Sequence, residues 1–379
     1  MKFTSNTIDL QKALNKLSGV VPAKSPLPVL ENILFDLLNN TLTLIATDNE
    51  LSLTMSLTVK GDEDGKIAIP AKRLLDTVRS FDEKSTPSFS ADVTTNKIII
   101  STSNGHYGLT GESAKEFPAS PQFKSTTDEI KIPVSTLKRI IHRTTFAVST
   151  DELRPAMMGV LLQSKSSELC AVSTDGHRLV KVLHKLSKGS GFKRDIIVPA
   201  KALQIVFKAV DSGDISIALN DTHIQFGYEN TYVVSRLIDE TYPNYESVIP
   251  SENDKTLTVD RNALVSSIRR VSLYASATTH QVKFDVTKAN VTISAQDIDF
   301  GGEAKETIEL DKKAGCEYQG EKLEIGFNAT YVLDMLTHLE SEKVVFKFSS
   351  PTRAGIISLD RPSNDEEVTM LVMPVRLTT

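Results

Sequence analysis

The phrase LKRIIHRTTFAV at residues 137–148 decides the fold, because it is the middle one of three related copies. LQKALNKLSGVV begins at Leu10 and LVSSIRRVSLYA at Leu264, so the opening leucine recurs at spacings of 127 and 127 residues. Within the middle copy, apolar residues mark one helical face and cations mark the opposite one. The phrase therefore predicts one amphipathic helix in each copy.

Three more phrases recur in the same order. A second helical phrase starts at Ile69, Val198 and Ile325. A strand runs into a turn at Asp48, Asp175 and Asp297, and an apolar-Pro step closes the copies at Phe117-Pro118, Tyr242-Pro243 and Met373-Pro374. Four phrases in one order at nearly equal spacing predict three homologous domains. The shared turn Asp predicts a β-turn held by its side chain.

Each repeat combines short alternating apolar segments with two helical phrases. We therefore expect an α+β fold in which each domain has antiparallel sheet and about two helices. The expected domains are 1–125, 126–252 and 253–379, with polar junctions near residues 121–130 and 249–257.

Composition indicates an intracellular, cytoplasmic protein. The 379 residues contain no apolar run long enough for a membrane span, and the N-terminus lacks the apolar core of a signal peptide. Cys170 and Cys316 have no partner spacing typical of zinc, so we interpret both as packing residues. We expect no metal, no cofactor and no membrane partner.

Charge is concentrated on the helices even though the formal net charge is −5. The first five helical phrases are rich in Lys and Arg and carry one acid, Asp76, whereas the sixth carries Asp334 and His338. A solvated cationic face is one interpretation. The other is a polyanion held through its phosphates, without reading of bases, against equivalent helices of all three repeats.

Several local motifs together resemble one known family. They are MKFT at the start, the P-LP-L phrase from Pro26 to Leu30, STDGHRL from Ser173 to Leu179, YPNY from Tyr242 to Tyr245 and the terminal VMPVRL. Over essentially the whole chain they resemble the bacterial sliding clamp, the beta subunit of DNA polymerase III. The resemblance implies three clamp domains that form a six-domain ring as a head-to-tail homodimer, with helices lining a hole for double-stranded DNA.

The resemblance also implies a pocket for short peptide motifs of the replicative polymerase subunit, the clamp loader and repair polymerases. The matching positions are Met157, Thr174, Gly176, His177, Arg178, Leu179, Pro243, Val248, Leu371, Met373, Pro374, Val375, Arg376 and Leu377. Apolar walls would take aromatic or leucine anchors, and Arg178 and Arg376 are expected as cations on the rim.

Two further surfaces follow. The predicted DNA-binding residues are Lys24, Arg73, Lys138, Arg139, Arg143 and Lys201. The predicted dimer interface contains Tyr107, Leu109, Leu273, Asp297 and Glu303. The chain departs from the best-known family pattern at Asp151 and at Pro155-Ala156, where that pattern has a polar amide and two aromatic residues.

Two other classes compete with a clamp. An enzyme is disfavoured because we find no phosphate-binding loop, nucleophile elbow, H-E-x-x-H or clustered carboxylate motif, and we expect no catalytic residues. A monomeric adaptor that binds proteins without encircling DNA is the alternative that the sequence leaves open.

Overall fold

The computed structural model describes residues 1–119, 128–165, 167–186, 191–361, 363 and 365–377. Most of the junction predicted at 121–130 lies outside these residues, as do Thr378 and Thr379.

Six α-helices form where the two recurring helical phrases predict them, among the residues described. They are α1 (Thr7–Leu17), α2 (Ala71–Arg79), α3 (Val134–Thr144), α4 (Ala200–Ala209), α5 (Arg261–Val271) and α6 (Ala329–Thr337). The first helices of the repeats begin 127 residues apart and the second helices 129 apart. Side-chain caps start several of them: Asn6 accepts from the backbone N–H of Ile8 at 2.8 Å, and Asp260 accepts from that of Ala263 at 2.7 Å.

Contacts divide the chain into two compact units, and each is described by itself. The first unit, residues 1–138 and 201–237, contains a five-stranded sheet in the order β5-β1-β7-β8-β9 and an eight-stranded sheet in the order β10-β15-β16-β17-β4-β3-β2-β6. Its strands are β1 (Lys2–Thr4), β2 (Asn32–Leu38), β3 (Thr41–Thr47), β4 (Leu51–Thr58), β5 (Lys60–Glu63), β6 (Gly65–Pro70), β7 (Ser88–Asp92), β8 (Lys97–Ser101), β9 (His106–Thr110), β10 (Asp128–Pro133), β15 (Asp214–Leu219), β16 (His223–Tyr228) and β17 (Thr231–Arg236).

The second unit, residues 139–200 and 238–379, contains a nine-stranded sheet in the order β14-β11-β12-β13-β26-β25-β24-β18-β22 and a four-stranded sheet in the order β21-β20-β19-β23. Its strands are β11 (Gly159–Lys165), β12 (Glu168–Thr174), β13 (Arg178–Lys185), β14 (Ile196–Pro199), β18 (Lys255–Asp260), β19 (Gln281–Val286), β20 (Asn290–Asp297), β21 (Gly302–Glu309), β22 (Glu317–Gln319), β23 (Leu323–Asn328), β24 (Lys343–Phe348), β25 (Gly355–Leu359) and β26 (Glu366–Val372).

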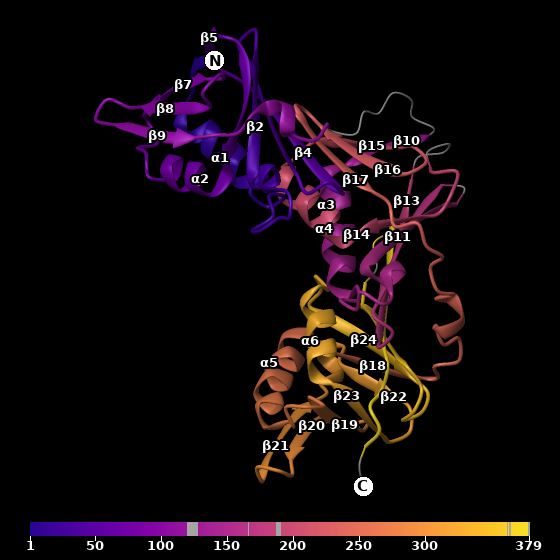
Figure 1. The fold of residues 1–379 in the computed structure, drawn as a ribbon. Helices are drawn as coiled ribbons and strands as arrows, with labels where there is room; N and C mark the ends of the chain where they lie inside the picture. Colours follow the sequence, from indigo (N-terminus) through magenta and orange to yellow (C-terminus); the bar gives the residue numbers. More distant parts are fainter. Residues whose placement is uncertain (120–127, 166, 187–190, 362, 364, 378–379) are drawn as a thin grey trace. The chain divides into compact units, whose positions relative to one another are not determined.

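The two large sheets are continuous across consecutive repeats. In each case the strand that follows the turn Asp of one repeat pairs, antiparallel, with the last strand of the next repeat: β4 with β17, and β13 with β26. Figure 1 shows β4 and β17 side by side in the first unit. Because sheets are shared, the contact units divide the second repeat, and the domain boundaries 1–125, 126–252 and 253–379 remain a prediction.

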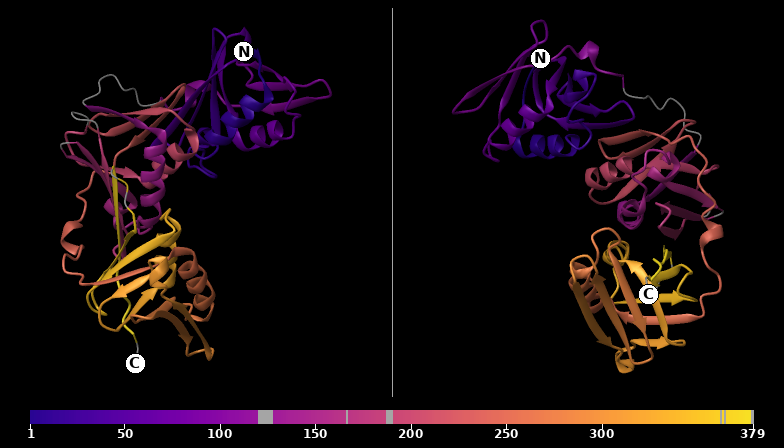
Figure 2. Two further views of the ribbon diagram at one scale, coloured as in Figure 1. Left: turned by 180° about the vertical axis from the view of Figure 1, so that it is seen from behind. Right: turned by 60° about the horizontal axis from the view of Figure 1, so that its bottom comes forward.

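The helix pairs of the first and third repeats pack against strands of their own repeats. α1 packs against α2, and α5 packs against α6 (Figures 1 and 2). Beneath the first pair, the rings of Phe3 and Phe89 stack with centroids 4.8 Å apart, and Phe284 and Phe327 meet edge to face at 5.5 Å in the last repeat. None of the helices in the described residues is long and apolar enough to cross a membrane.

Candidate functional site

The turn between β12 and β13 is held by the carboxyl group of Asp175. Its Oδ1 accepts hydrogen bonds from the backbone N–H groups of His177 at 2.9 Å and Arg178 at 3.0 Å. Gly176 has a φ of +91°, in the left-handed region that glycine adopts without a Cβ penalty. Its counterpart in the first repeat, Asn49, has a φ of +78°. The predicted turn is therefore confirmed, and it places Gly176 and His177 at the surface.

Arg178 is buried beneath this turn. Its Nε lies 3.0 Å from Asp175 Oδ2, and its Nη1 lies 2.6 Å from Asp334 Oδ2 on α6. The guanidinium also lies between the rings of Phe146 and Tyr331, at 5.2 and 4.8 Å from their centroids. The side chain is about 10% exposed, so the expectation of an exposed cation on the rim is wrong for Arg178. It instead links the turn of the second repeat to the second helix of the third.

The C-terminal tail begins beside this turn. The N–H of Met373 donates to the carbonyl of His177 at 2.9 Å, and the N–H of Val375 donates to the carbonyl of Gly326 at 2.9 Å. A Cβ on Gly326 would lie 2.7 Å from the carbonyl oxygen of Val375, so only glycine lets the tail run this close to β23. Met373 is 42% exposed, and Arg376 is exposed as expected.

An apolar cluster lies under the turn and the start of the tail. Leu179 and Leu371, which pair across β13 and β26, belong to it together with Val172 and Tyr245. Tyr242 packs against the cluster and donates to the carbonyl of Val172 at 3.4 Å. The segment that carries Pro243 and Val248 is thereby held next to the sheet, and Val248 remains 52% exposed.

Two further predicted pocket residues, Met157 and Thr174, are buried. Met157 is 8% exposed and follows Ala156, which packs against the same cluster. Thr174 donates to the carbonyl of Arg178 at 2.6 Å and accepts from the N–H of Gly176 at 3.0 Å. The structure thus brings the turn, the tail and the segment around Pro243 into one neighbourhood.

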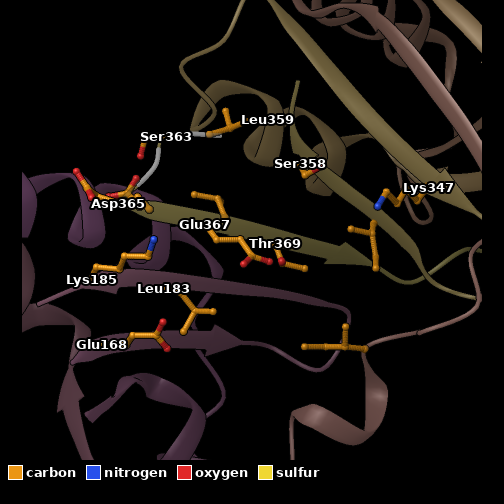
Figure 3. A pocket seen from close by; sticks show the side chains of 14 residues that line it. Glu168, Leu183, Lys185, Lys347, Ser358, Leu359, Ser363, Asp365, Glu367 and Thr369 are labelled. Atoms are coloured by element: carbon orange, nitrogen blue, oxygen red, sulfur yellow. The ribbon is translucent and has the colours of Figure 1, made fainter. Parts of the chain in front are cut away.

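A separate cavity of about 560 Å³ lies toward the other ends of β13 and β26 (Figure 3). Leu183, Lys185, Glu367 and Thr369 line it from these two strands, and Lys347 lines it from β24. None of the predicted pocket residues borders this cavity.

The six predicted DNA-binding residues differ in accessibility. Lys24 and Arg73 are exposed. Lys201 is exposed but pairs with Asp48 of the first repeat, and Lys138 Nζ lies 5.2 Å from the centroid of the Phe207 ring.

Arg139 and Arg143 share the carboxylate of Glu366. Arg139 Nε lies 3.5 Å from Glu366 Oε2, and Arg143 pairs with the same carboxyl group. Arg143 and Glu366 are 7% and 6% exposed, so burial in an ion pair contradicts the predicted DNA contact of Arg143. Burial lowers the pKa of the Arg143 guanidinium, whereas Glu340 opposes this effect. The periodicity of α3 could not reveal which of its cations faces inward.

The predicted interface residues lie in the first and third repeats. Leu109 on β9 is buried at 8% exposure and borders, with Arg73, a hollow of about 700 Å³. Tyr107 is 39% exposed, with its ring centroid 5.2 Å from that of Phe81, and Leu273 is 81% exposed. Glu303 is exposed on β21, and Asp297 holds the turn before it by accepting from the N–H of Asp299 at 3.1 Å.

Sequence reasoning missed several residues of this site. Tyr331, Phe146 and Gly326 reach it only through tertiary packing, which no local pattern reports. One signal was present: the sixth helical phrase lacks cations and carries Asp334, the residue that binds Arg178. Among the described residues there is no group of three or more His, Cys, Asp or Glu side chains that could hold a metal ion.

A repeated α+β unit, sheets shared between consecutive repeats and a tail that runs beside the turn of Asp175 are the features of three-domain clamp proteins. Family profiles agree with this class along the chain. The profile of the DNA polymerase III beta subunit, N-terminal domain, matches residues 1–121, that of the central domain matches 131–244 and that of the C-terminal domain matches 246–376. The chain belongs to the DNA polymerase III beta subunit family, whose members are non-catalytic subunits of that polymerase.

Individual relatives cover the chain from end to end. The beta sliding clamp of Chlamydia pneumoniae is 30% identical over 378 residues, which cover 100% of this chain and 99% of the relative. That of Pseudomonas putida is 30% identical over 380 residues and is covered completely. Among solved structures, the DnaN sliding clamp of Bartonella birtlesii bound to griselimycin has a TM-score of 0.91 at 30% identity, with both chains covered completely. The clamp of Bacillus subtilis has a TM-score of 0.90 at 28% identity, also with complete coverage.

The buried pair of Arg143 and Glu366 leads to a stability prediction. Replacing Glu366 with Ala leaves a buried guanidinium without its closest carboxylate, which should lower the free energy of unfolding by about 3 kcal/mol. Denaturant titration measures this change. The control is Glu367→Ala, because the neighbouring side chain is exposed and should alter stability by less than about 0.5 kcal/mol. Equal effects of the two variants would contradict the assignment.

Proposed function

We propose that this chain is a DNA sliding clamp that closes as a homodimer around double-stranded DNA and tethers partner proteins through short peptides. The observation that carries the proposal is the way the repeats are joined. The strand after the turn Asp pairs with the last strand of the next repeat at both internal junctions. β21 is the strand after the turn Asp of the third repeat, and β9 is the last strand of the first repeat. The same rule therefore pairs β21 of one copy with β9 of another.

The ends of the chain support such a junction. β9 is the edge of its five-stranded sheet and β21 the edge of its four-stranded sheet, and uncovered edges of this kind favour pairing with another chain. The exposed Leu273 supplies an apolar side chain, and the hollow beside Leu109 supplies a place to bury it. A head-to-tail contact that repeats twice closes a ring of six domains.

DNA would pass through this ring without tight binding. Lys24 and Arg73 remain our proposed phosphate-facing cations, together with Lys138, Arg139 and Lys201. Three of these five engage groups of the protein itself: Lys138 lies over Phe207, Arg139 binds Glu366 and Lys201 binds Asp48. Screening over a Debye length of about 8 Å weakens each phosphate contact further, so retention would depend on the closed ring.

The turn and the tail form our proposed peptide site. Exposed Met373, Val248 and His177 surround an apolar base that contains Leu179 and Leu371. An extended peptide with aromatic or leucine anchors fits such a surface, and exposed Arg376 would attract acidic groups. The partners we propose are the replicative polymerase subunit, the clamp loader and repair polymerases, all in the cytoplasm.

The first test of this function is retention on DNA. If the ring supplies persistence, loaded protein should leave circular DNA at least about ten-fold more slowly than linear DNA in moderate salt, because sliding off an end is open only on linear DNA. Gel filtration of labelled protein on nicked and linearised plasmid measures both rates. Equal rates would favour the monomeric adaptor over the ring.

The second test concerns the two exposed cations. Lys24→Glu combined with Arg73→Glu should weaken loading or DNA affinity without lowering the melting temperature, because both side chains are exposed. Lys115→Glu serves as a control with an exposed cation outside the proposed set. Light scattering must accompany the assay, since Arg73 also borders the hollow at β9. A parallel loss of thermal stability would assign the cations a structural role.

The third test concerns the peptide site. Deleting residues 373–379 should abolish binding of a labelled polymerase-derived peptide, and Met373→Ala should weaken it about ten-fold, while dimer mass and melting temperature stay nearly unchanged. Leu38→Ala is the matched control, because Leu38 is an apolar side chain that is 60% exposed and far from the site in sequence. Undiminished affinity in the truncated dimer would contradict this location.

A further inference from the structure

Two ion pairs join the first repeat to the second, and both lie at positions that have counterparts in the other repeats. The turn residue Asp48 uses Oδ1 to accept from the N–H groups of Glu50 and Leu51, and it uses Oδ2 to bind Lys201. Lys201 is the second residue of α4, the second helix of the next repeat. Asp48 therefore stabilises its own turn through Oδ1 and binds the second repeat through Oδ2.

The second pair lies on the first helix. Lys16 of α1 binds Asp211 Oδ2 at 3.0 Å and donates to the carbonyl of Ala209 at 2.8 Å. Asp211 follows the end of α4 by two residues. A cation near the end of the first helix thus meets an acid just after the second helix of the next repeat.

The junction of the second and third repeats keeps the residue types of the second pair, although Arg143 there binds Glu366 and Glu340 acts on it only through its charge. Arg143 is the counterpart of Lys16, and Glu340 is the counterpart of Asp211, at the same offsets from their helices. Thr330 replaces the lysine at the second position of α6, and here the turn supplies its own cation, Arg178, which binds Asp334. The absence of that lysine and the presence of Arg178 therefore compensate each other.

The chain ends carry the parts of the first kind of junction. The turn before β21 repeats the hydrogen bonds of the first turn, with Asp297 Oδ1 accepting from Asp299 and Phe300 at 3.1 and 3.3 Å. Phe300 stands where Arg178 does in the second turn, so this turn brings no cation of its own. Lys72 is the second residue of α2, as Lys201 is of α4, and it is exposed.

The chain also has counterparts of both residues of the second ion pair. Arg270 lies 127 residues after Arg143 on α5 and has the position of Lys16 on α1. Asp82 lies three residues after the end of α2, equivalent to Asp211 at the same offset of eleven from the first helical residue, and it is exposed. All three repeats therefore have a cation at the first position, and all three have an acid at the second.

We propose that the junction between two copies is fixed by two ion pairs, Asp297 with Lys72 of the second copy and Arg270 with Asp82 of the second copy. The inference rests on the proposed ring dimer and adds the residues that set its register. Within its own chain Arg270 binds Glu306 through Nε and Nη2, at 2.6 and 2.7 Å. The proposal assigns its Nη1 to Asp82.

A double-mutant cycle at the first pair tests the proposal. Lys72→Gln and Asp297→Asn should each raise the dimer dissociation constant about three-fold or more at low salt, because each ring contains the contact twice. The amide in Asp297→Asn keeps an Oδ1 that accepts the two turn hydrogen bonds, so this variant removes the charge and leaves the turn in place. The double variant should weaken the dimer no more than either single variant, because the second change has no ion pair left to break. Lys12→Gln, at an exposed cation on α1, controls for the change of net charge. Analytical ultracentrifugation over a range of concentrations measures each constant, and Asp82→Lys alone gives an independent test of the second pair.

The outcomes separate this inference from the proposed function. Wild-type protein that stays monomeric at all concentrations would contradict the ring itself. A wild-type dimer whose dissociation constant is unchanged by Lys72→Gln, Asp297→Asn and Asp82→Lys would overturn only the ion pairs. Effects of Lys72→Gln and Asp297→Asn that add in the double variant would also overturn the pairing of Asp297 with Lys72.

Discussion

Antiparallel pairing between the strand after a turn Asp and the last strand of the next repeat is the contact on which the rest of the structure depends. β4 with β17 and β13 with β26 turn separate repeats into continuous sheets, so the backbone hydrogen bonds of each repeat are completed by its neighbour. The sheet edges left at β9 and β21 are the positions that this rule leaves unfilled within one chain. Dimerisation, in this account, is the same pairing applied once more between copies.

The proposed peptide site is a consequence of one of these junctions. β13 and β26 come from different repeats, and their pairing sets the tail beside the turn that carries His177. The buried link from Arg178 to Asp334 then holds α6 against the same turn. Among the described residues the second junction alone combines these parts, because the first junction has no tail beside its turn and the third turn has Phe300 in place of an arginine. This difference would allow a repeated fold to carry the single peptide site that we propose.

Much of the fold could be predicted from sequence, because helical periodicity and repeat spacing can be read directly along the chain. The six helices, the strands between them and the turn Asp all form where their phrases recur. Side-chain direction could not be predicted in the same way. Arg143 and Arg178 lie in segments rich in cations, and their burial is favourable because acids from the neighbouring repeat, Glu366 and Asp334, pair with them across a junction. Gly326 likewise matters only because the tail passes over it.

The central claim is that the chain ends join by the rule that joins the repeats. The mass of the wild-type protein in solution, measured by multi-angle light scattering at micromolar concentration, tests it most directly. We expect a single species of twice the 41.6 kDa of one chain. A species of 41.6 kDa that persists as concentration rises would rule out the proposed junction, because β9 and β21 would then remain unpaired edges.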